Sequence, residues 1–342
     1  YLKMFLKKGY VVKFIGDNYL HEEPYTSTLQ QMGIEVLYGQ EYLTGIWDWL
    51  VKNGKDIHVA YLNRPHIATK YVDFIKEHTD IKMIYYGHDL HFMREFREYE
   101  LTGDVKKRQE SEYWKSIEFS LFHKVAVSYY PSYVEEEAIH AVDETIPVKA
   151  ITAYVYEEFL QNLNKDFAKR EGLLFVGGFA HPPNADAVLW FAKEVFPKIR
   201  EQIKVNFYIV GSKVTDEIKA LEQPGNGIIV KGFVSEEELA DLYRNCRIVV
   251  VPLRYGAGVK GKVVEAIYNG APIVTTSVGS EGIPDVEKVL LVKDQPDEFA
   301  ETVVELYKDE KRLEDLAEKT QVYIREHFSI DAAWDVIKED FE

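Results

Sequence analysis

The 342-residue chain contains a single cysteine, Cys246, and this scarcity excludes two classes of protein. One thiol cannot close an intrachain disulfide, and it cannot supply the ligands of a cysteine-based zinc cluster. Such a composition is typical of a reducing compartment. We expect Cys246 to be buried as a small hydrophobic side chain.

The sequence also has no long apolar run. No hydrophobic stretch approaches the roughly 18 residues of a transmembrane helix, and no secretory signal pattern is recognisable. We therefore predict a globular cytoplasmic protein. Peripheral contact with the inner face of a membrane stays open as an alternative.

Basic residues are in deficit. The chain has 41 Lys and Arg against 57 Asp and Glu, a formal net charge of −16. Nucleic acid binds to surfaces rich in lysine and arginine, so a nucleic-acid partner is not expected. Any basic site must therefore be local. With 46% hydrophobic residues, the chain is large enough to form two cores.

Strand and helix patterns alternate along the chain, which is typical of parallel sheets with helices on both faces. The predicted strands are 10–15, 34–37, 57–62, 82–86 and 124–128 in a first series, then 173–176, 205–210, 227–230, 248–251, 272–275 and 289–292 in a second. We expect one domain over 1–155 and another over 156–328, with a final helix over 329–342 that returns to the first. In doubly wound domains, ligands bind beyond the carboxyl ends of the strands.

The most informative segment is PLRYGAGVKGKVVEAIYNGAPIVTT, residues 252–276. Lys260 and Lys262 stand beside a predicted helix N-terminus, whose unpaired N–H groups attract anions. Glu265 follows about one turn later, within reach of a ribose hydroxyl. Three glycines let the backbone approach a ligand closely: Gly256, Gly258 and Gly261. The segment predicts a site for a nucleotide diphosphate.

Two other interpretations of this segment remain open. The glycines fit the dinucleotide pattern G-x-G-x-x-G, but no acidic residue follows about 20 positions later at a strand end, so a nicotinamide cofactor is less favoured. The glycines and lysines could also form an ordinary exposed turn before a helix.

In order along the chain, several segments resemble the donor-binding domain of retaining glycosyltransferases of the family 4 type, the glycosyl transferases group 1. They are FVGGFAHPPN (175–184), YIVGS (208–212), VKGFVSEEELADLYRNCRIVVVPL (230–253), GVKGKVVEAIYNGAPIVTT (258–276) and GSEGI (279–283). The first half agrees more loosely, through LNRPHIA (62–68) and YGHDLHFMREFREYELTGD (86–104). The resemblance covers nearly the whole chain. It implies the GT-B fold, an α/β architecture of two facing Rossmann-like domains with doubly wound parallel sheets.

The resemblance implies that the second domain binds a nucleotide-sugar, with no cofactor and no metal ion. Glu265 matches the second glutamate of the family's Glu-x7-Glu signature and would bind the ribose, while backbone around 232–234 would contact the base. The implied donor-binding residues are Gly177, Gly178, His181, Gly211, Gly232, Phe233, Val234, Arg254, Gly258, Val259, Gly261 and Glu265.

The sequence departs from the family pattern at three places. The first glutamate of the signature is replaced, since Ala257 stands eight residues before Glu265. The basic pair after the domain's first strand is absent, because the chain has Phe179, Ala180 and His181 there. The chain starts with a predicted helix entering a strand, so the family's first βα unit is missing. This start fits either a fragment of a longer, multidomain transferase or a protein that has lost part of its acceptor side.

We expect Lys260, Lys262 and His88 to carry the chemistry, with Arg254 as a further substitute for the missing basic pair. Departure of a nucleoside diphosphate builds negative charge, which fixed cations and N–H groups stabilise. His88 follows the strand 82–86 and can move a proton near neutral pH, with a structural hydrogen bond as the alternative. The resemblance implies retention of anomeric configuration without a protein nucleophile. Lysines can neutralise a diphosphate where Mg²⁺ would otherwise do so.

Five residues near predicted strand ends of the first domain are assigned to the acceptor side: Arg64, His66, Asp89, His91 and Arg94. Plainer roles are open, because Pro65 makes a turn at this point and Arg94 can pair with Glu98 four residues on. His88 and His91 lack further ligands for a metal site. Asn184 is expected to cap the helix after His181, and the acidic runs 135–137 and 236–238 to lie on solvated helix faces or first turns.

These features predict a metal-independent glycosyltransferase of polysaccharide or glycoconjugate synthesis. It would move a sugar from a nucleotide-sugar to a glycan or lipid-linked acceptor with retention. A catalytically weak GT-B nucleotide-binding or scaffold module is one alternative, motivated by the departures above. A sugar-nucleotide epimerase of similar architecture is another. Hydrolysis of glycosides by paired carboxylates is disfavoured, because the sequence shows no facing acid pair.

Overall fold

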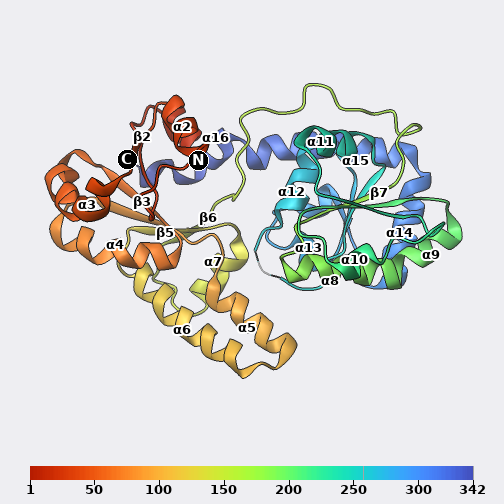
Figure 1. Ribbon diagram of the computed structural model, residues 1–342, viewed down its shortest axis with the longest axis horizontal. Coiled ribbons are helices and arrows are strands. Elements are labelled where there is room, and N and C mark those ends of the chain that lie inside the picture. The colour runs from red at the N-terminus through yellow and green to blue at the C-terminus, as the bar shows by residue number, and fades with distance from the viewer. Residues whose placement is uncertain (257, 342) are drawn as a thin grey trace. The chain divides into compact units, whose positions relative to one another are not determined.

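The computed structural model describes residues 1–256 and 258–341. By its internal contacts the chain divides into two units (Figure 1). The first comprises Tyr1–Val155 with Ala333–Glu342, and the second comprises Tyr156–Ala332. All strand pairs in both units are parallel, so the α/β class predicted from the sequence is confirmed.

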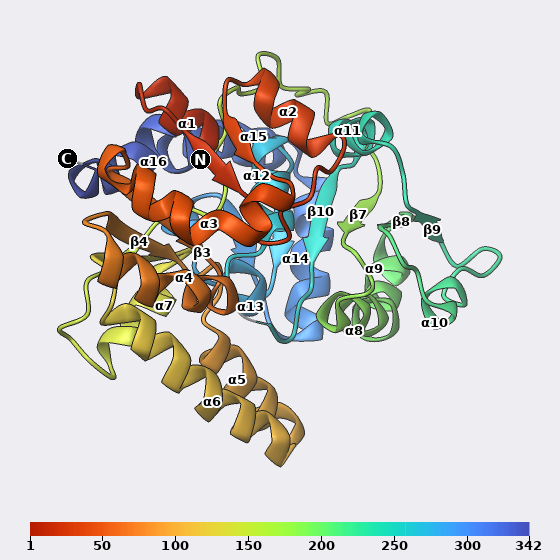
Figure 2. The ribbon, with the colours of Figure 1, turned by 60° about the vertical axis from the view of Figure 1, so that its left-hand side comes forward.

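The first unit contains two parallel sheets. Strands β1 (Lys13–Ile15) and β2 (Glu35–Leu37) form one, and β3 (Val59–Asn63), β4 (Lys82–Tyr86), β5 (Val127–Tyr130) and β6 (Val148–Ala150) form the other, in that order. The helices of this unit are α1 (Leu2–Lys7), α2 (Tyr25–Gln31), α3 (Gln40–Asn53), α4 (Pro65–His78), α5 (His91–Thr102), α6 (Val105–Phe122) and α7 (Tyr133–His140). Helices α5 and α6 pack side by side as a hairpin (Figures 1 and 2).

Two details of the first unit differ from the sequence prediction. Strand β5 begins at Val127 rather than at position 124, because the N–H groups of His123 and Lys124 still bond to the last turn of α6. Strand β6 was not predicted, since Val-Lys-Ala is too short to give an apolar run. It is found only through its pairing with β5.

The second unit is built on one six-stranded parallel sheet. Its strands are β7 (Leu173–Val176), β8 (Phe207–Val210), β9 (Ile228–Gly232), β10 (Ile248–Val251), β11 (Ile273–Thr275) and β12 (Leu290–Val292), in the spatial order β12-β11-β10-β7-β8-β9. This is the doubly wound order of dinucleotide-binding folds.

Helices cover both faces of this sheet (Figure 1). On one face lie α11 (Glu236–Asn245), α12 (Gly261–Tyr268) and α15 (Glu310–Phe328), and on the other lie α8 (Pro182–Trp190), α9 (Phe196–Gln202), α10 (Asp216–Lys219) and α14 (Pro296–Lys308). The short helix α13 (Ser277–Ser280) follows β11, and α16 (Ile330–Ile337) contains the boundary between the units. Cys246 is 3% exposed, as predicted for a small hydrophobic side chain.

Strands β7 and β10 are neighbours at the centre of the sheet (Figure 2). Leu173 and Leu174 pair with Ile248 and Val249, and all four residues of β10 are buried. Such continuous apolar runs are typical of strands covered on both faces. The strand order reverses between β7 and β10, so their following loops leave the same edge of the sheet in opposite directions.

The loops after β7 and β8 approach each other too closely for a side chain. A Cβ on Gly211 would lie 1.9 Å from the carbonyl oxygen of Gly177. The N–H of Gly211 also donates to the carbonyl of Gly232 at 2.8 Å. Gly211 therefore sets the spacing of three successive loops at the carboxyl edge of the sheet.

Replacing Gly211 by alanine is expected to lower the free energy of unfolding by more than about 2 kcal/mol, because the backbone of two loops must move to admit the methyl group. Gly45→Ala in α3 is the matched control, since its Cβ would meet no atom within 4 Å. It is expected to stabilise the protein by about 0.5–1 kcal/mol. Urea unfolding measures both variants, and equal midpoints for Gly211→Ala and the parent would refute the close approach.

Candidate functional site

The turn after β7 packs against the first turn of α8. Asn184 is 5% exposed, and its Nδ2 donates to the carbonyl oxygen of Gly178 at 2.7 Å. The prediction that Asn184 caps α8 is wrong. The helix begins at Pro182, with His181 as the preceding residue, and the Asn184 amide points to the turn instead of to the helix N–H groups.

Lys262, the second residue of α12, reaches the same turn from another element. Its Nζ donates to Asn184 Oδ1 at 2.7 Å and lies 5.6 Å from the centre of the Phe175 ring. A Cβ on Gly177 would lie 3.0 Å from Asn184 Nδ2 and 3.2 Å from Lys262 Cε. The glycine, the amide and the lysine are therefore closely packed, and a side chain at position 177 would displace one of them.

Two ammonium groups lie near each other at the start of α12. Burial and, to a smaller extent, the charge of Lys260 together lower the pKa of Lys262 to about 8. Lys260 is 9% exposed and donates to the carbonyl of Gly258. Because desolvation and like charges both disfavour the ammonium form, an anion bound here would stabilise both lysines.

Arg254 is bound to a carboxylate. Its Nε donates to Asp186 Oδ2 at 2.9 Å, a second nitrogen donates to Asp186 Oδ1, and the guanidinium lies 5.9 Å from the centre of the Trp190 ring. The hydrogen bond to Asp186 raises the pKa of Arg254 above its ordinary value. Its charge is already compensated, which makes it a weaker candidate for phosphate contact than Lys262, whose hydrogen bond goes to a neutral amide.

Glu265 lies one turn after Lys262 in α12 and is partly buried. Burial raises the pKa of its carboxyl, and the neighbouring Tyr243 hydroxyl partly offsets this effect. Tyr243 comes from α11 and is 1% exposed. The carboxylate therefore has a polar neighbour and a partly solvated face, which suits it to accept hydrogen bonds from ribose hydroxyls. Ala257, which replaces the other signature glutamate, lies outside the described residues.

The remaining predicted donor residues all follow strands at the carboxyl edge of the sheet. Gly211 follows β8, Gly232 ends β9, and Gly258, Val259 and Gly261 lie between β10 and the first turn of α12. Phe233 is 80% exposed directly after β9. The structure therefore brings the predicted residues of the second unit to one edge of one sheet.

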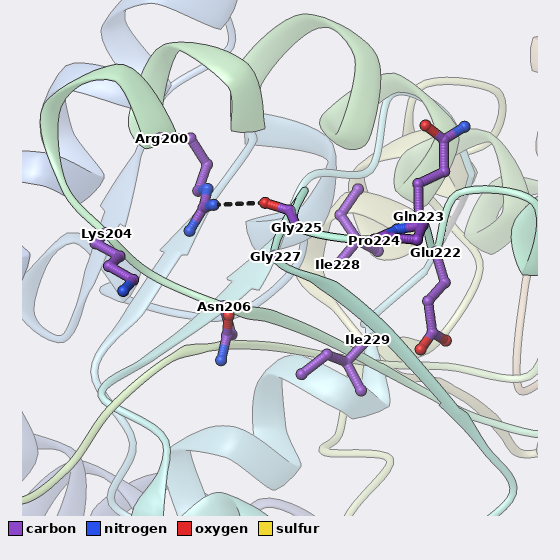
Figure 3. Close-up of a pocket in the computed structure, with 10 residues that line it drawn as sticks. All are labelled: Arg200, Lys204, Asn206, Glu222, Gln223, Pro224, Gly225, Gly227, Ile228 and Ile229. Carbon is purple, nitrogen blue, oxygen red and sulfur yellow. Dashed lines mark hydrogen bonds between the residues drawn. The ribbon is translucent and has the colours of Figure 1, made fainter.

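A hollow of about 500 Å³ lies at the opposite edge of this sheet (Figure 3). It is lined by Arg200, Lys204, Asn206, Glu222, Gln223, Pro224, Gly225, Gly227, Ile228 and Ile229. Arg200 donates to the carbonyls of Val205 and Gly225, both at 3.0 Å, and so ties two loops together. None of the predicted site residues lines this hollow.

In the first unit, two non-glycine residues with left-handed backbone stand at adjacent strand ends. Arg64 follows β3 with φ +62°, and His88 follows β4 with φ +66°. The strands pair at Asn63 and Tyr86, and the N–H of Arg64 donates to the carbonyl of Tyr86 at 3.1 Å. Backbone strain of this kind clusters at functional sites, which makes this edge a candidate site.

The His88 ring is held by its neighbours. Its Nε2 lies 3.2 Å from Asn63 Oδ1, and its centre lies 4.3 Å from that of Tyr86. Burial lowers the pKa of His88 to about 4, helped by the positive charge of Arg64. The imidazole is therefore neutral at pH 7 and has one nitrogen that accepts a proton and one that donates.

His91 is 7% exposed, and its ring packs on Trp114 at 4.7 Å between centres. Burial by itself lowers the pKa of His91, but the Glu118 carboxylate, 3.4 Å from Nδ1, outweighs burial, and the pKa is raised overall. Glu118 is fully buried and accepts the N–H groups of His91 and Phe92 at the start of α5. This geometry favours a structural role for His91 over an acceptor contact.

Two expectations for polar residues of the first unit can be compared with the structure. Arg94 does not pair with Glu98, the alternative left open by the sequence; it binds Asp89 and Glu95, the latter through Nη2 at 2.8 Å. In the acidic run 135–137, Glu135 lies in the first turn of α7, one of the two expected placements, where it is fully buried and accepts a hydrogen bond from Ser132. Each of these contacts joins residues that are close in the sequence.

Two residues assigned to the acceptor side lie at the start of α4 and are exposed. They are Arg64, which precedes the helix, and His66, in its first turn.

Among the described residues, no group of three or more His, Cys, Asp or Glu side chains is arranged to hold a metal ion. In the same part of the chain, no helix combines the length and apolar character needed to cross a lipid bilayer.

Comparison with known proteins adds two kinds of similarity. Residues 170–309 match the family described as "Glycosyl transferases group 1". A curated relative, the uncharacterized 44.6 kDa protein in the cps region of Klebsiella pneumoniae, is 29% identical over 184 residues, which cover 51% of this chain and 45% of the relative. The matched region thus spans about half the length of that relative.

Solved glycosyltransferases share the fold. A glycosyltransferase from Rickettsia africae has a TM-score of 0.71 at 11% identity, covering 99% of this chain and 92% of its own. HepE from Anabaena, solved in complex with UDP, has a TM-score of 0.67 at 13% identity, covering 97% and 99%. TarM from S. aureus, solved with UDP among its ligands, has a TM-score of 0.65 at 14% identity, covering 86% and 58%. The predicted GT-B fold is confirmed.

The buried ammonium of Lys262 is expected to make stability depend on pH. Its pKa in the folded protein, about 8, is below the ordinary value of 10.5, so protonation favours the unfolded chain and the destabilisation disappears as pH rises between these values. We expect the stability advantage of Lys262→Met over the parent to fall by about 1–3 kcal/mol between pH 7 and pH 10. Urea unfolding across this range measures it, with the exposed Lys311→Met as control. A constant difference would contradict the buried charge.

Proposed function

We propose that this protein is a glycosyltransferase whose second unit holds a nucleotide-sugar donor. The observation that carries the proposal is the cationic pair Lys260 and Lys262 at the N-terminus of α12, beside the point where the strand order reverses. A nucleotide phosphate binds favourably at such a place. The match of residues 170–309 to glycosyl transferases supports the same conclusion.

In this proposal each part of the nucleotide has its own contacts. The diphosphate lies at the start of α12, where the helix begins without a side-chain cap and its N–H groups are available to oxygen atoms. The ribose binds Glu265, one turn further along. The base lies near Gly232 and Val234, with the exposed Phe233 ring between them. Neighbours solved with UDP make a UDP-sugar the first donor to test.

The chemistry proposed is departure of a nucleoside diphosphate. Negative charge grows on its phosphates in the transition state, and fixed cations stabilise it without reorganisation. With a pKa of about 8, Lys262 is mostly protonated at pH 7, and a bound phosphate raises that pKa further. We propose that transfer proceeds with retention and without a metal ion, because the lysines and helix N–H groups take the metal's electrostatic role.

The acceptor, a glycan or a lipid-linked sugar, is assigned to the first unit. Arg64 and His88 are the preferred contacts, because their strained backbones project from the carboxyl ends of β3 and β4. The relative in a cps region supports a role in polysaccharide or glycoconjugate synthesis. Action in the cytoplasm, including at the inner face of a membrane, belongs to the same proposal.

A catalytically weak nucleotide-binding module is the second candidate. The pairing of Arg254 with Asp186 favours it, because a cation that could bind the diphosphate is already compensated. The replacement of the first signature glutamate by Ala257 favours it as well. The two candidates share the nucleotide site and differ in turnover.

A nucleotide is expected to raise the melting temperature, because it binds the folded protein and not the unfolded chain. Screening UDP, GDP, dTDP, ADP and CMP by thermal shift identifies the base, and no shift with any of them would contradict the donor site.

Glu265→Ala is expected to weaken the binding of the identified nucleotide by roughly 1–3 kcal/mol through loss of a charge-assisted hydrogen bond. Glu305→Ala, exposed on α14, is the control. Calorimetry measures the dissociation constants of the parent, Glu265→Ala and Glu305→Ala, and equal values for all three would rule out the ribose contact.

Lys262→Ala is expected to reduce kcat for sugar transfer more than it reduces affinity for the nucleoside diphosphate, because the lysine acts on charge that develops in the transition state. Nucleoside diphosphate release across a donor panel, in the presence and absence of acceptor glycans, provides kcat. Equal losses in both quantities would assign Lys262 to ground-state binding. A donor that binds the parent but never turns over would favour the module.

A further inference from the structure

We infer that Asn184 is a positioning residue of the donor site, which holds the Lys262 ammonium against the turn after β7. The contact itself is a feature of the described structure. Its effect on catalysis rests on the proposed function.

The Asn184 side chain makes two hydrogen bonds, one as a donor through its nitrogen and one as an acceptor through its oxygen. Its Nδ2 donates to the carbonyl of Gly178 and its Oδ1 accepts from Lys262 Nζ, both at 2.7 Å. A carboxylate could accept from the lysine but could not donate to the carbonyl, and an alanine could do neither. At 5% exposure the amide is shielded from competing water, which strengthens both bonds.

The contact brings positive charge to a turn that has none of its own. Between β7 and α8 the chain carries Phe179, Ala180 and His181, without lysine or arginine. Lys262 supplies the charge from α12, across the strand-order reversal between β7 and β10. The glycine at position 177 leaves room for this approach, since a Cβ there would lie 3.2 Å from Lys262 Cε, which is tighter than an ordinary contact.

Positioning matters for a lysine, because its long side chain has many rotamers and loses entropy when it is held in one of them. An ammonium has three donors. The bond to Asn184 uses one donor and fixes the direction of the other two. A neutral acceptor leaves the full positive charge for a phosphate, whereas a carboxylate in its place would neutralise that charge.

Few charged groups act on the Lys262 ammonium. Lys260, which precedes α12, lowers its pKa. Helix α8 brings Asp186, but that carboxylate binds Arg254, and β7 contributes the Phe175 ring. Within the described ranges 1–256 and 258–341 no carboxylate forms an ion pair with Lys262, so a carboxylate introduced by Asn184→Asp should raise the pKa of the lysine.

The ionisation of Lys262 can be measured without any substrate, by acylation with acetic anhydride at a series of pH values followed by peptide mass spectrometry. In the parent we expect a midpoint near pH 8, and in Asn184→Asp a midpoint higher by about one pH unit or more. In Asn184→Ala we expect the midpoint to move up toward the ordinary value of 10.5, because the ammonium loses its anchor and turns toward solvent, which relieves the burial that lowers its pKa. Parent-like behaviour in the folded variants would overturn the contact.

Gln321 in α15 provides a matched control, because its side chain also binds α12. It is 8% exposed, and its Nε2 donates to the carbonyls of Ile267 and Tyr268 at the other end of α12. Gln321→Ala removes a buried amide of the same kind and is expected to lower the melting temperature without changing the acylation profile of Lys262. If Gln321→Ala changed the acylation profile of Lys262 as much as Asn184→Ala does, the change would reflect a general loosening of α12, and the inference would be refuted.

Catalysis is measured separately. Both Asn184 variants are expected to lower kcat at least about tenfold while the nucleotide dissociation constant changes less, and full kcat in either would refute the positioning role. If acylation shifts as expected but the parent transfers no sugar from any donor, the proposed function fails and the contact stands. If the parent transfers sugar and acylation is parent-like, the proposed function stands and the inference fails.

Discussion

The adjacency of β7 and β10 determines what the second unit can bind. Because the two strands are parallel, α8 and α12 begin at the same edge of the sheet, and because the strand order reverses between β7 and β10, the two helices lie on opposite faces there. Their N-termini carry partial positive charge, and the hydrogen bond between Lys262 and Asn184 joins their first turns. An anion at this edge is therefore attracted by two helices and by a lysine that links them.

Helix α8 binds two cations in chemically different ways. Asp186 binds Arg254 through a carboxylate and compensates its charge, while Asn184 binds Lys262 through an amide and leaves its charge intact. Both partners lie on one helix, two positions apart. The first pair ties the loop after β10 to α8, and the second directs a charged group to the place where we propose that the diphosphate binds. This division explains why only some of the basic residues near the site are suited to bind phosphate.

The sequence was sufficient to predict the strands that have apolar runs and the edge of the sheet where the candidate site lies. Central strands such as β7 and β10 are continuous apolar segments, and the glycine-rich segment before α12 is a local pattern. The site's contacts were not predictable in the same way. The partners Lys262 and Asn184 stand 78 positions apart, and Arg254 and Asp186 stand 68 apart, so no local pattern links them. Burial of His91 likewise depends on α6, a separate element.

The crowding around the glycines has a consequence for how proteins of this kind diverge. A Cβ at Gly211 would lie 1.9 Å from the carbonyl oxygen of Gly177, so inherited substitutions at Gly211 should be purged. Phe233 is different, because four-fifths of its surface is in contact with solvent and replacement disturbs little packing. Under the proposed function, evolutionary change in base preference should therefore accumulate at the end of β9, while Gly211 stays constant among descendants.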